Sequence, residues 1–490
     1  MTYVLALDAG TTALKGTLFD EFGRVAASYA DEYALQKPQP DWVELDAETY
    51  WQSALRATRA VLSASKVAPG DVRSIGVTSQ GETLIVLDRT GHPLRKAIVW
   101  LDNRSRAESD ALSREFAVEE VYRRTGQQEI VPTWTATRLL WLRRNEPETF
   151  RRAHKFVLVE DYLIYRLTGC YATDRGLNPS TLYYDLHTGE WWPEMLRFLG
   201  TSPGQLPELK TSGEVVGALT ASAARETGLN PETLVTTAPI DQIAGAVGAG
   251  NLEPGMVTEC TGAAMALCAT IDRPMYDPRR RVGLYAHALP GRYALLPWAP
   301  TAGMALRWFR DTFAAGTDYA SLISEATAVE PGADGLLMLP HLCGAFGPEP
   351  DSRAKGAFCG ITLAHGRGHF VRAILEAVAF LVRENLEMLE SLGVPVREVR
   401  SLGGAARSDA WLQIKADVCR RDLLVLECEE ATGLGTAMIS AVGNGTYQSL
   451  EEASVKMVRV RQRVSVRADS ARRYEEVYQR YRALDRTLKG

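Results

Sequence analysis

The sequence predicts an α/β protein made of two lobes that share one plan. Its 490 residues are more than one hydrophobic core usually organises, so at least two domains are expected. Residues 4–20, VLALDAGTTALKGTLFD, read as an apolar strand, a tight polar turn and a second strand. Residues 256–267, MVTECTGAAMAL, repeat this pattern without repeating its identities. Strands followed by alternating strands and helices are typical of the α/β class.

The first turn carries the groups that a phosphate site needs. Asp8 ends the first strand, and Gly10 lets the chain turn tightly because it has no Cβ. Thr11 and Thr12 place hydroxyls beside backbone N–H groups, and Lys15 adds a positive charge just beyond them. Such a turn can cradle a phosphate while one carboxylate remains for a metal ion. An ordinary hairpin turn is the alternative interpretation.

Two familiar phosphate-binding motifs do not fit this turn. A Walker loop needs G-x-x-x-x-G-K-[ST] before a helix, and a dinucleotide fingerprint needs G-x-G-x-x-G at the start of a helix. Residues 8–16 have neither spacing, and residues 14–19 look like a strand.

The composition is typical of a soluble globular enzyme, with 46% hydrophobic and 23% charged residues. The net charge of −5 argues against nucleic acid or an anionic membrane as a partner. Seven cysteines without a C-x-x-C pair indicate reduced thiols, a cytoplasmic location and no zinc site. We see no signal peptide, and no apolar run approaches the roughly 18 residues of a membrane helix.

Local patterns set the elements of the first half. The helix that begins at Asp46 has a carboxylate cap and one apolar face. Trp191 and Trp192 lie in an aromatic stretch and are expected to be packing anchors. The predicted strands are 24–33, 72–78, 83–88 and 97–100, and the predicted helices are 46–63, 104–115, 136–144 and 160–167.

A boundary is predicted where Gly and Ala concentrate, near residues 245–250, which gives domains 1–245 and 246–490. Just before it, a strand at 234–237 leads to Asp241 and a helix of small residues. A carboxylate at that point is either a helix N-cap or a catalytic group.

Three later segments complete the second half. Residues 369–392 form a long helix with apolar residues at helical spacing, which indicates core packing. Residues 399–408 read as a strand, a glycine turn and a helix, so a flat ring or a phosphate can approach the backbone. Small residues at 431–437 begin a helix that must pack closely against a neighbour.

Six motifs follow one another along the chain: Asp8-Ala-Gly-Thr-Thr, Gln80-Gly-Glu-Thr, Ala97-Ile-Val-Trp-Leu-Asp102, Asp241-Gln242, Thr261-Gly262 and Gly403-Gly404-Ala405. In this order they resemble the FGGY carbohydrate kinases, which include glycerol kinases and xylulokinases. The block GITLAH at 360–365, before the long helix, is also similar to that family. The resemblance runs the full chain and implies two actin-like, RNase H-like lobes with a nucleotide cleft between them.

The resemblance implies transfer of phosphate from ATP to a hydroxyl of a small sugar or polyol. It makes Asp241 the expected general base and Asp8 the expected holder of Mg²⁺. The phosphates of ATP are expected at Thr11, Thr12, Lys15, Thr261 and Gly262, and its adenine at Gly403, Gly404 and Ala405. The sugar pocket is expected to comprise Gln80, Glu82, Trp100, Asp102, Asp241 and Gln242.

Departures from the family patterns rank the substrates. Glycerol kinases carry Arg-Glu where this chain has Gly81-Glu82, and an aromatic where it has Ala264. Xylulokinases have Met-His near 81–82 and Asn near 242. We therefore expect a pentulose such as xylulose first, another ketose or a sugar alcohol second, and glycerol third.

Two other questions stay open at this stage. A protein of another class could have the same fold without transferring phosphate to a sugar. The alternatives are an actin- or chaperone-like ATPase and a non-catalytic sugar sensor. Many relatives are dimers, so a homodimer is a further alternative to a monomer.

Overall fold

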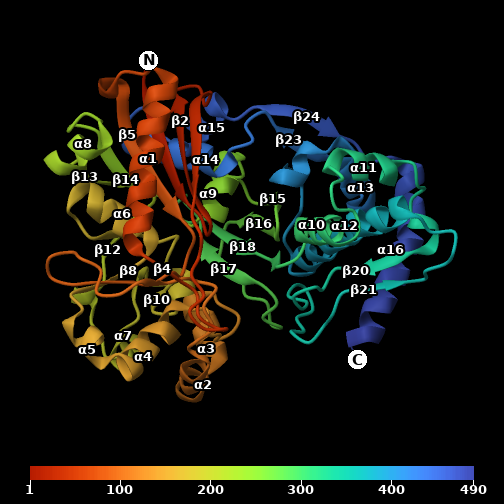
Figure 1. Cartoon of the computed structure of the whole chain (residues 1–490), viewed down its shortest axis with the longest axis horizontal. Helices are drawn as coiled ribbons and strands as arrows, with labels where there is room; N and C mark the ends of the chain where they lie inside the picture. Colours follow the sequence, from red (N-terminus) through yellow and green to blue (C-terminus); the bar gives the residue numbers. More distant parts are fainter. Residues whose placement is uncertain (490) are drawn as a thin grey trace. The chain divides into compact units, whose positions relative to one another are not determined.

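The computed structural model describes residues 1–489 and divides into two compact units (Figure 1). Unit 1 comprises Met1–Leu252, Asp272–Ala294 and Glu430–Val458. Unit 2 comprises Glu253–Ile271, Leu295–Glu429 and Arg459–Gly490. Within residues 1–489, no helix has both the length and the apolar character needed to cross a membrane.

Unit 1 is built on a six-stranded mixed sheet in the order β13-β14-β5-β1-β2-β3. The first strand runs antiparallel to the second and parallel to β5, and β5 runs parallel to β14. The strands predicted at 24–33, 72–78 and 234–237 are confirmed. The bounds are β1 Tyr3–Ala9, β2 Ala13–Asp20, β3 Val25–Glu32, β5 Val72–Ser79, β13 Val215–Ala218 and β14 Leu234–Thr237.

Helices cover both faces of this sheet. A Cβ on Gly16 of β2 would meet Ala57 of α1 (Ala47–Ser65) at 3.0 Å. Its neighbours on the strand point to the opposite face, where Thr17 and Phe19 pack against Gly433 of α14 (Ala431–Gly443). The predicted cap of α1 is confirmed, because the Asp46 carboxylate accepts the backbone N–H of Glu48.

Close helix packing ties α14 to α9 (Asp241–Gly248), as the small residues predict. A Cβ on Gly435 would lie 1.8 Å from the carbonyl oxygen of Ala244, and one on Gly248 would lie 1.9 Å from that of Ala431. Only glycine allows this approach. Residues distant in sequence thus join the helix that begins with Asp241 (Figure 1).

The rest of unit 1 has a second apolar core, in which Trp192 is fully buried as predicted. The helices predicted at 104–115, 136–144 and 160–167 correspond to α2, α4 and α6. The helices are α2 Arg106–Glu115, α3 Val118–Thr125, α4 Thr135–Asn145, α5 Pro147–Arg152, α6 Val159–Thr168, α7 Pro193–Leu199, α8 Ala221–Thr227 and α15 Leu450–Met457. The short strands are β4 Glu44–Leu45, β6 Ile85–Leu87, β7 Ala97–Ile98, β8 Lys155–Val157, β9 Ala172–Asp174, β10 Tyr184–Asp185, β11 Glu190–Trp191, β12 Glu208–Lys210 and β17 Gly283–Ala286.

Unit 2 repeats the strand plan of unit 1. Its first hairpin strand, β15, runs antiparallel to β16 and parallel to β22, and β22 runs parallel to β23. The strands are β15 Met256–Thr261, β16 Met265–Ile271, β19 Trp298–Ala299, β20 Leu337–Leu339, β21 Ala357–Cys359, β22 Glu398–Leu402, β23 Leu423–Leu426 and β24 Val460–Val464, and β18 Tyr293–Leu296 spans the border. The duplicated hairpin expected from residues 256–267 is therefore confirmed.

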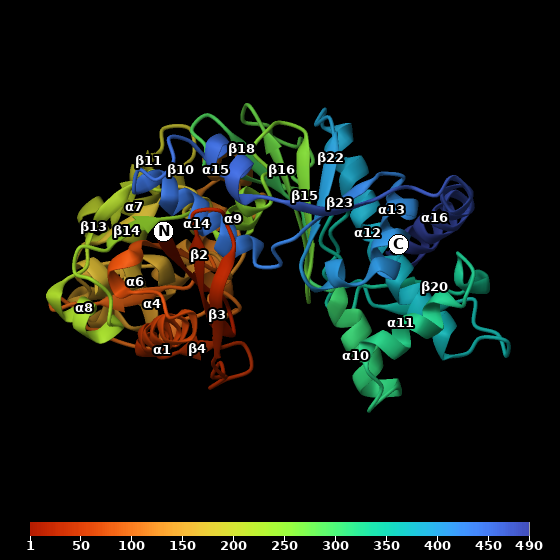
Figure 2. The same ribbon diagram turned by 90° about the horizontal axis from the view of Figure 1, so that it is seen from above.

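The helices of unit 2 form one packed group beside its sheet (Figure 2). The long helix expected at 369–392 is α12, whose apolar residues are buried as predicted except for the half-buried Phe370. The helices are α10 Gly303–Phe313, α11 Tyr319–Thr327, α12 Arg367–Ser391, α13 Asp409–Cys419 and α16 Ala468–Lys489.

Candidate active site

The first turn of unit 1 has the predicted form. The Gly10 N–H donates to the Ala13 carbonyl at 3.0 Å, which closes the turn. Asp8 lies opposite Lys15 in the β1–β2 register. The Nζ of Lys15 reaches the carboxylate of Glu430 at 2.6 Å. The Lys15 ammonium group, which was expected to bind phosphate, therefore forms an ion pair with Glu430 at the start of α14.

Asp8 has a carboxylate that the protein itself does not satisfy. Its Oδ1 is buried and has no hydrogen-bond partner among the described residues. Burial raises its pKa to about 6. The positive charge of Lys15 lowers this pKa, and the negative charge of Glu430 raises it. A buried oxygen without a partner costs free energy unless a ligand satisfies it. Asp8 therefore fits a metal-bound role, since Mg²⁺ commonly takes one carboxylate and completes its shell with water and phosphate oxygens.

Asp241 is the first residue of α9, and the cap position belongs to Ile240. The Asp241 carboxylate accepts the N–H of its neighbour Gln242, at 2.8 Å, and within residues 1–489 the start of α9 has no side-chain capping bond, so helix capping does not explain this carboxylate. Burial raises its pKa well above the usual value, and the negative charges of Asp8 and Glu82 raise it further. Asp8, Glu82 and Asp241 are therefore close enough to interact electrostatically.

Two hydrogen bonds anchor the segment that carries Asp241. The Thr78 hydroxyl donates to the carbonyl of Pro239 at 2.7 Å, and the N–H of Ala238 donates to the carboxyl of Glu160 at 3.1 Å. Glu160 is fully buried, and burial together with the charge of Asp174 raises its pKa well above the usual value. Sequence reasoning missed Glu160, because its place in a predicted helix gave no signal that its side chain reaches the segment after β14.

Glu82 occupies a strained backbone position. Its φ of 63° lies in the left-handed region that non-glycine residues rarely adopt. Its carbonyl accepts Arg138 Nη1 at 2.9 Å and the Thr135 hydroxyl at 3.1 Å, which hold this conformation. Burial raises the pKa of its side chain to about 7, opposed by the nearby Ser180 hydroxyl and the charge of Arg138. Such strain persists where the surroundings impose it and is frequent at functional sites.

Gln80 and Trp100 lie beside these groups. Gln80 Nε2 donates to the Tyr50 hydroxyl at 3.1 Å, while its Oε1 is buried without a partner among residues 1–489. Trp100 Nε1 donates to the Thr11 hydroxyl at 2.8 Å, so the aromatic side chain contacts the first turn. The structure thus connects the predicted sugar-binding and phosphate-binding residues of unit 1.

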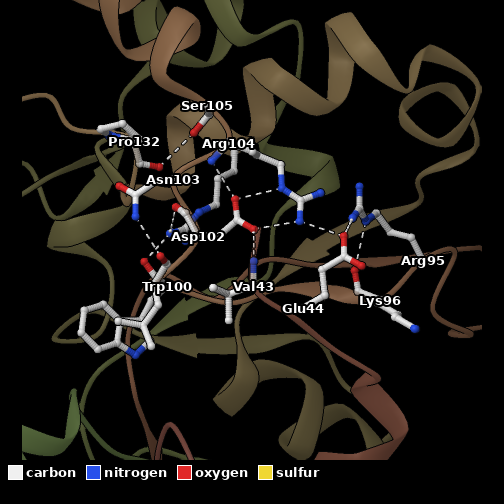
Figure 3. A network of polar contacts seen from close by, with 12 residues as sticks. Val43, Glu44, Arg95, Lys96, Trp100, Asp102, Asn103, Arg104, Ser105 and Pro132 are labelled. Carbon is white, nitrogen blue, oxygen red and sulfur yellow. Dashed lines mark hydrogen bonds and ion pairs between the residues drawn. The ribbon is translucent and has the colours of Figure 1, made fainter. Parts of the chain in front are cut away.

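Asp102 differs from the other predicted sugar ligands, because its carboxylate is fully engaged (Figure 3). The side chain is fully buried, and both of its oxygens accept hydrogen bonds from Arg104. A further bond comes from the N–H of Val43 at 2.5 Å. Arg104 continues the network to Glu44 at 2.8 Å and stacks 3.7 Å over the ring of Trp42. Gln242, in contrast, is exposed.

In unit 2, the two predicted nucleotide turns lie side by side. Gly403 has a φ of 77°, and a Cβ there would lie 2.8 Å from the carbonyl oxygen of Thr261. Gly262, Gly403 and Gly404 are exposed, whereas Thr261 and Ala405 are buried. The strand–glycine–helix pattern is confirmed, with a short 3₁₀ turn at Gly404–Arg407 before α13. Exposed small residues leave the backbone accessible to a phosphate or a ring.

Comparison with known protein families gives the class. Residues 3–248 match the N-terminal domain of the FGGY family of carbohydrate kinases, and residues 275–443 match its C-terminal domain. The two α/β units with mixed sheets thus correspond to the two domains of a carbohydrate kinase, which is a sugar phosphotransferase. The chain belongs to the FGGY family of carbohydrate kinases, whose members use ATP. The predicted fold class and type of enzyme are confirmed.

The chain is similar to several curated kinases over nearly its whole length. It is 30% identical over 484 residues to the xylulose kinase of Bacillus subtilis (strain 168), covering 99% of this chain and 97% of that one. It is 33% identical over 458 residues to a glycerol kinase of Thermococcus gammatolerans, covering 92% and 91%. The crystal structure of xylulose kinase from Rhodospirillum rubrum superposes with a TM-score of 0.90 at 30% identity and 99% coverage of both chains.

Proposed function

We propose that this kinase transfers the γ-phosphoryl group of ATP to a hydroxyl of a pentulose such as xylulose. One observation carries the proposal: Asp241 starts a helix without capping it, and its half-buried carboxylate interacts with the charges of Asp8 and Glu82. A raised pKa suits a general base, because it brings proton affinity closer to neutral pH. Asp241 accepts the hydroxyl proton as the sugar oxygen bonds to phosphorus and the bond to ADP breaks.

The other residues bind and orient the two substrates. Thr11, Thr12, Lys15, Thr261 and Gly262 contact the phosphates, and Gly403, Gly404 and Ala405 line the adenine. Asp8 holds Mg²⁺, which neutralises phosphate charge when bound. Its unpartnered buried oxygen supports this role.

The sugar pocket comprises Gln80, Glu82, Trp100, Asp102 and Gln242. The unpartnered Gln80 Oε1 and the Glu82 carboxyl can each take a sugar hydroxyl. Asp102 contributes by fixing the segment after Trp100, since its own oxygens are engaged.

The residues next to Glu82 favour a sugar longer than glycerol. A Cβ on Gly81 would lie 2.9 Å from the Ile240 side chain and 3.3 Å from the Ser180 hydroxyl, so an arginine here would displace Ile240. The position therefore lacks the charged group that glycerol kinases carry beside their glutamate. The glycerol kinase relative at 33% identity makes glycerol the second candidate.

The test is a substrate panel of xylulose, other ketoses, alditols and glycerol, with ADP release measured in each case. We expect the highest kcat/KM for a pentulose, with glycerol lower by at least about tenfold, the scale set by missing substrate contacts. If kcat/KM were higher for glycerol than for every pentulose, glycerol would become the assigned substrate. ADP release that no sugar stimulates would reject sugar phosphorylation.

A further inference from the structure

A fully buried ion pair lies directly behind the phosphate turn of unit 2. Lys415 of α13 and Glu259 of β15 are 0% exposed. Lys415 Nζ lies 2.8 and 2.9 Å from the two carboxylate oxygens of Glu259. The Ser401 hydroxyl of β22 donates to the same carboxylate at 2.7 Å. The pair therefore joins a helix and two strands of one unit.

The network ends on Thr261, the residue before the turn. Lys415 Nζ donates to the Thr261 hydroxyl at 2.9 Å, and that hydroxyl donates to Glu259. The Thr261 hydroxyl is thus bound inside the protein, while Gly262, Ala263 and Ala264 are exposed. The Gly262 N–H donates to the Ala264 carbonyl at 2.9 Å, which closes the turn. Phosphate contacts from this turn are therefore expected from the backbone N–H groups of Ala263 and Ala264.

The far side of the turn is fixed by the start of α10. The N–H groups of Gly303 and Met304 donate to the carbonyls of Gly262 and Ala263, both at 3.0 Å. A Cβ on Gly303 would lie 2.4 Å from the Gly262 carbonyl oxygen, so only glycine permits this contact. The exposed turn is therefore held by a helix start on one side and by the Lys415 network on the other.

A buried ion pair is weak evidence for stability, because desolvation offsets much of the attraction between the charges. Its other role is to fix a position, which suits a turn that must present N–H groups to phosphates. We propose that Lys415 and Glu259 are positioning residues that orient Thr261 and the 262–264 turn for nucleotide phosphates. The inference rests on the proposed function, which assigns phosphate binding to this turn.

The structure supplies a matched control in the same unit. Arg372 and Glu376 of α12 also form a buried ion pair, at 2.7 Å. Their further partners are Tyr474, the N–H of Gly332 and the carbonyls of Ala326 and Val329, and none of these belongs to a nucleotide turn. A variant of this pair reports what loss of a buried charge does to stability alone.

The test compares Lys415→Met, Glu259→Gln and the control Arg372→Met. We expect the two turn variants to raise the KM for ATP and the Kd for ADP by about tenfold or more, the scale of losing an orienting group behind a ligand. The KM for the sugar should stay within about twofold, because the change removes nucleotide contacts only. Arg372→Met should lower the Tm without this selective loss. A folded Lys415→Met with wild-type ADP affinity, or an equal loss in Arg372→Met, would overturn the inference.

Thr261 gives a second route if the charge variants fail to fold. Thr261→Val removes the hydroxyl that Lys415 and Glu259 hold, whereas Thr261→Ser keeps it. We expect weaker ADP binding in the valine variant and partial recovery in the serine variant. Equal affinity in both would contradict the inference. Because ADP binding by calorimetry needs no sugar turnover, failure of the proposed sugar activity is detected separately in the wild-type substrate panel.

Discussion

The two hairpins share one backbone plan but treat their buried acids in opposite ways. In unit 1, Asp8 keeps a buried oxygen without a partner in the described part of the chain, and its pKa is raised to about 6. In unit 2, Glu259 is surrounded by Lys415, Ser401 and Thr261. An unsatisfied carboxylate is available to a ligand, whereas a satisfied one fixes its neighbours. Repetition of a fold therefore does not repeat its chemistry.

The largest effect is expected at Asp241, the proposed general base of unit 1. Asp241→Asn preserves its shape and removes the base, so kcat should fall by about 100-fold or more. Circular dichroism and Tm should show intact folding. Turnover close to wild type would reject Asp241 as the base.

A direct comparison of the two hairpins comes next. Asp8→Ala should raise the Mg²⁺ concentration for half-maximal activity by about tenfold or more, because it removes a ligand rather than a structural pair. Glu259→Gln, measured at saturating ATP, should leave that concentration near wild type. An unchanged Mg²⁺ dependence in Asp8→Ala, or an equal change in both variants, would remove the contrast between the hairpins.

The pH profile tests the electrostatic coupling of Asp241 to its neighbours. Asp241 acts as a base only when ionised, and its raised pKa places the acidic limb of kcat/KM above the ordinary aspartate range. Glu82→Gln removes one of the negative charges that raise this pKa, so the limb should move to lower pH by a fraction of a unit. The shift is limited because Glu82, with a pKa of about 7, is itself partly protonated there. A limb that moves to higher pH would contradict the coupling.

The smallest kinetic effect is expected at Asp102, whose carboxylate is engaged as fully as that of Glu259. Asp102→Asn weakens bonds to Arg104 and the Val43 N–H, so stability should fall by about 1–3 kcal/mol. The KM for the sugar should rise only slightly, through displacement of Trp100. Denaturant unfolding and sugar kinetics measure the two quantities. A large rise in KM at unchanged stability would show direct contact with the sugar.

The sequence determined the features that depend on neighbouring residues. Apolar runs and glycine turns predicted both hairpins, and the cap at Asp46 predicted α1. Motif order predicted the family and the kind of enzyme, which the family comparison confirmed. The roles of the individual site residues and the identity of the sugar remain predictions. Local pattern suffices for secondary structure because backbone preferences and side-chain periodicity act over a few residues.

Only the tertiary structure decided which acids are satisfied. Asp8 and Glu259 look alike in sequence, since each lies on a strand just before a small polar turn. Their partners come from far along the chain, with Lys415 supplied by α13 and Glu430 by the start of α14. The strained φ of Glu82 and the closed network of Asp102 likewise depend on Arg138, Arg104 and Val43. Burial and long-range charge set these states, and neither is encoded in the residues beside the acid.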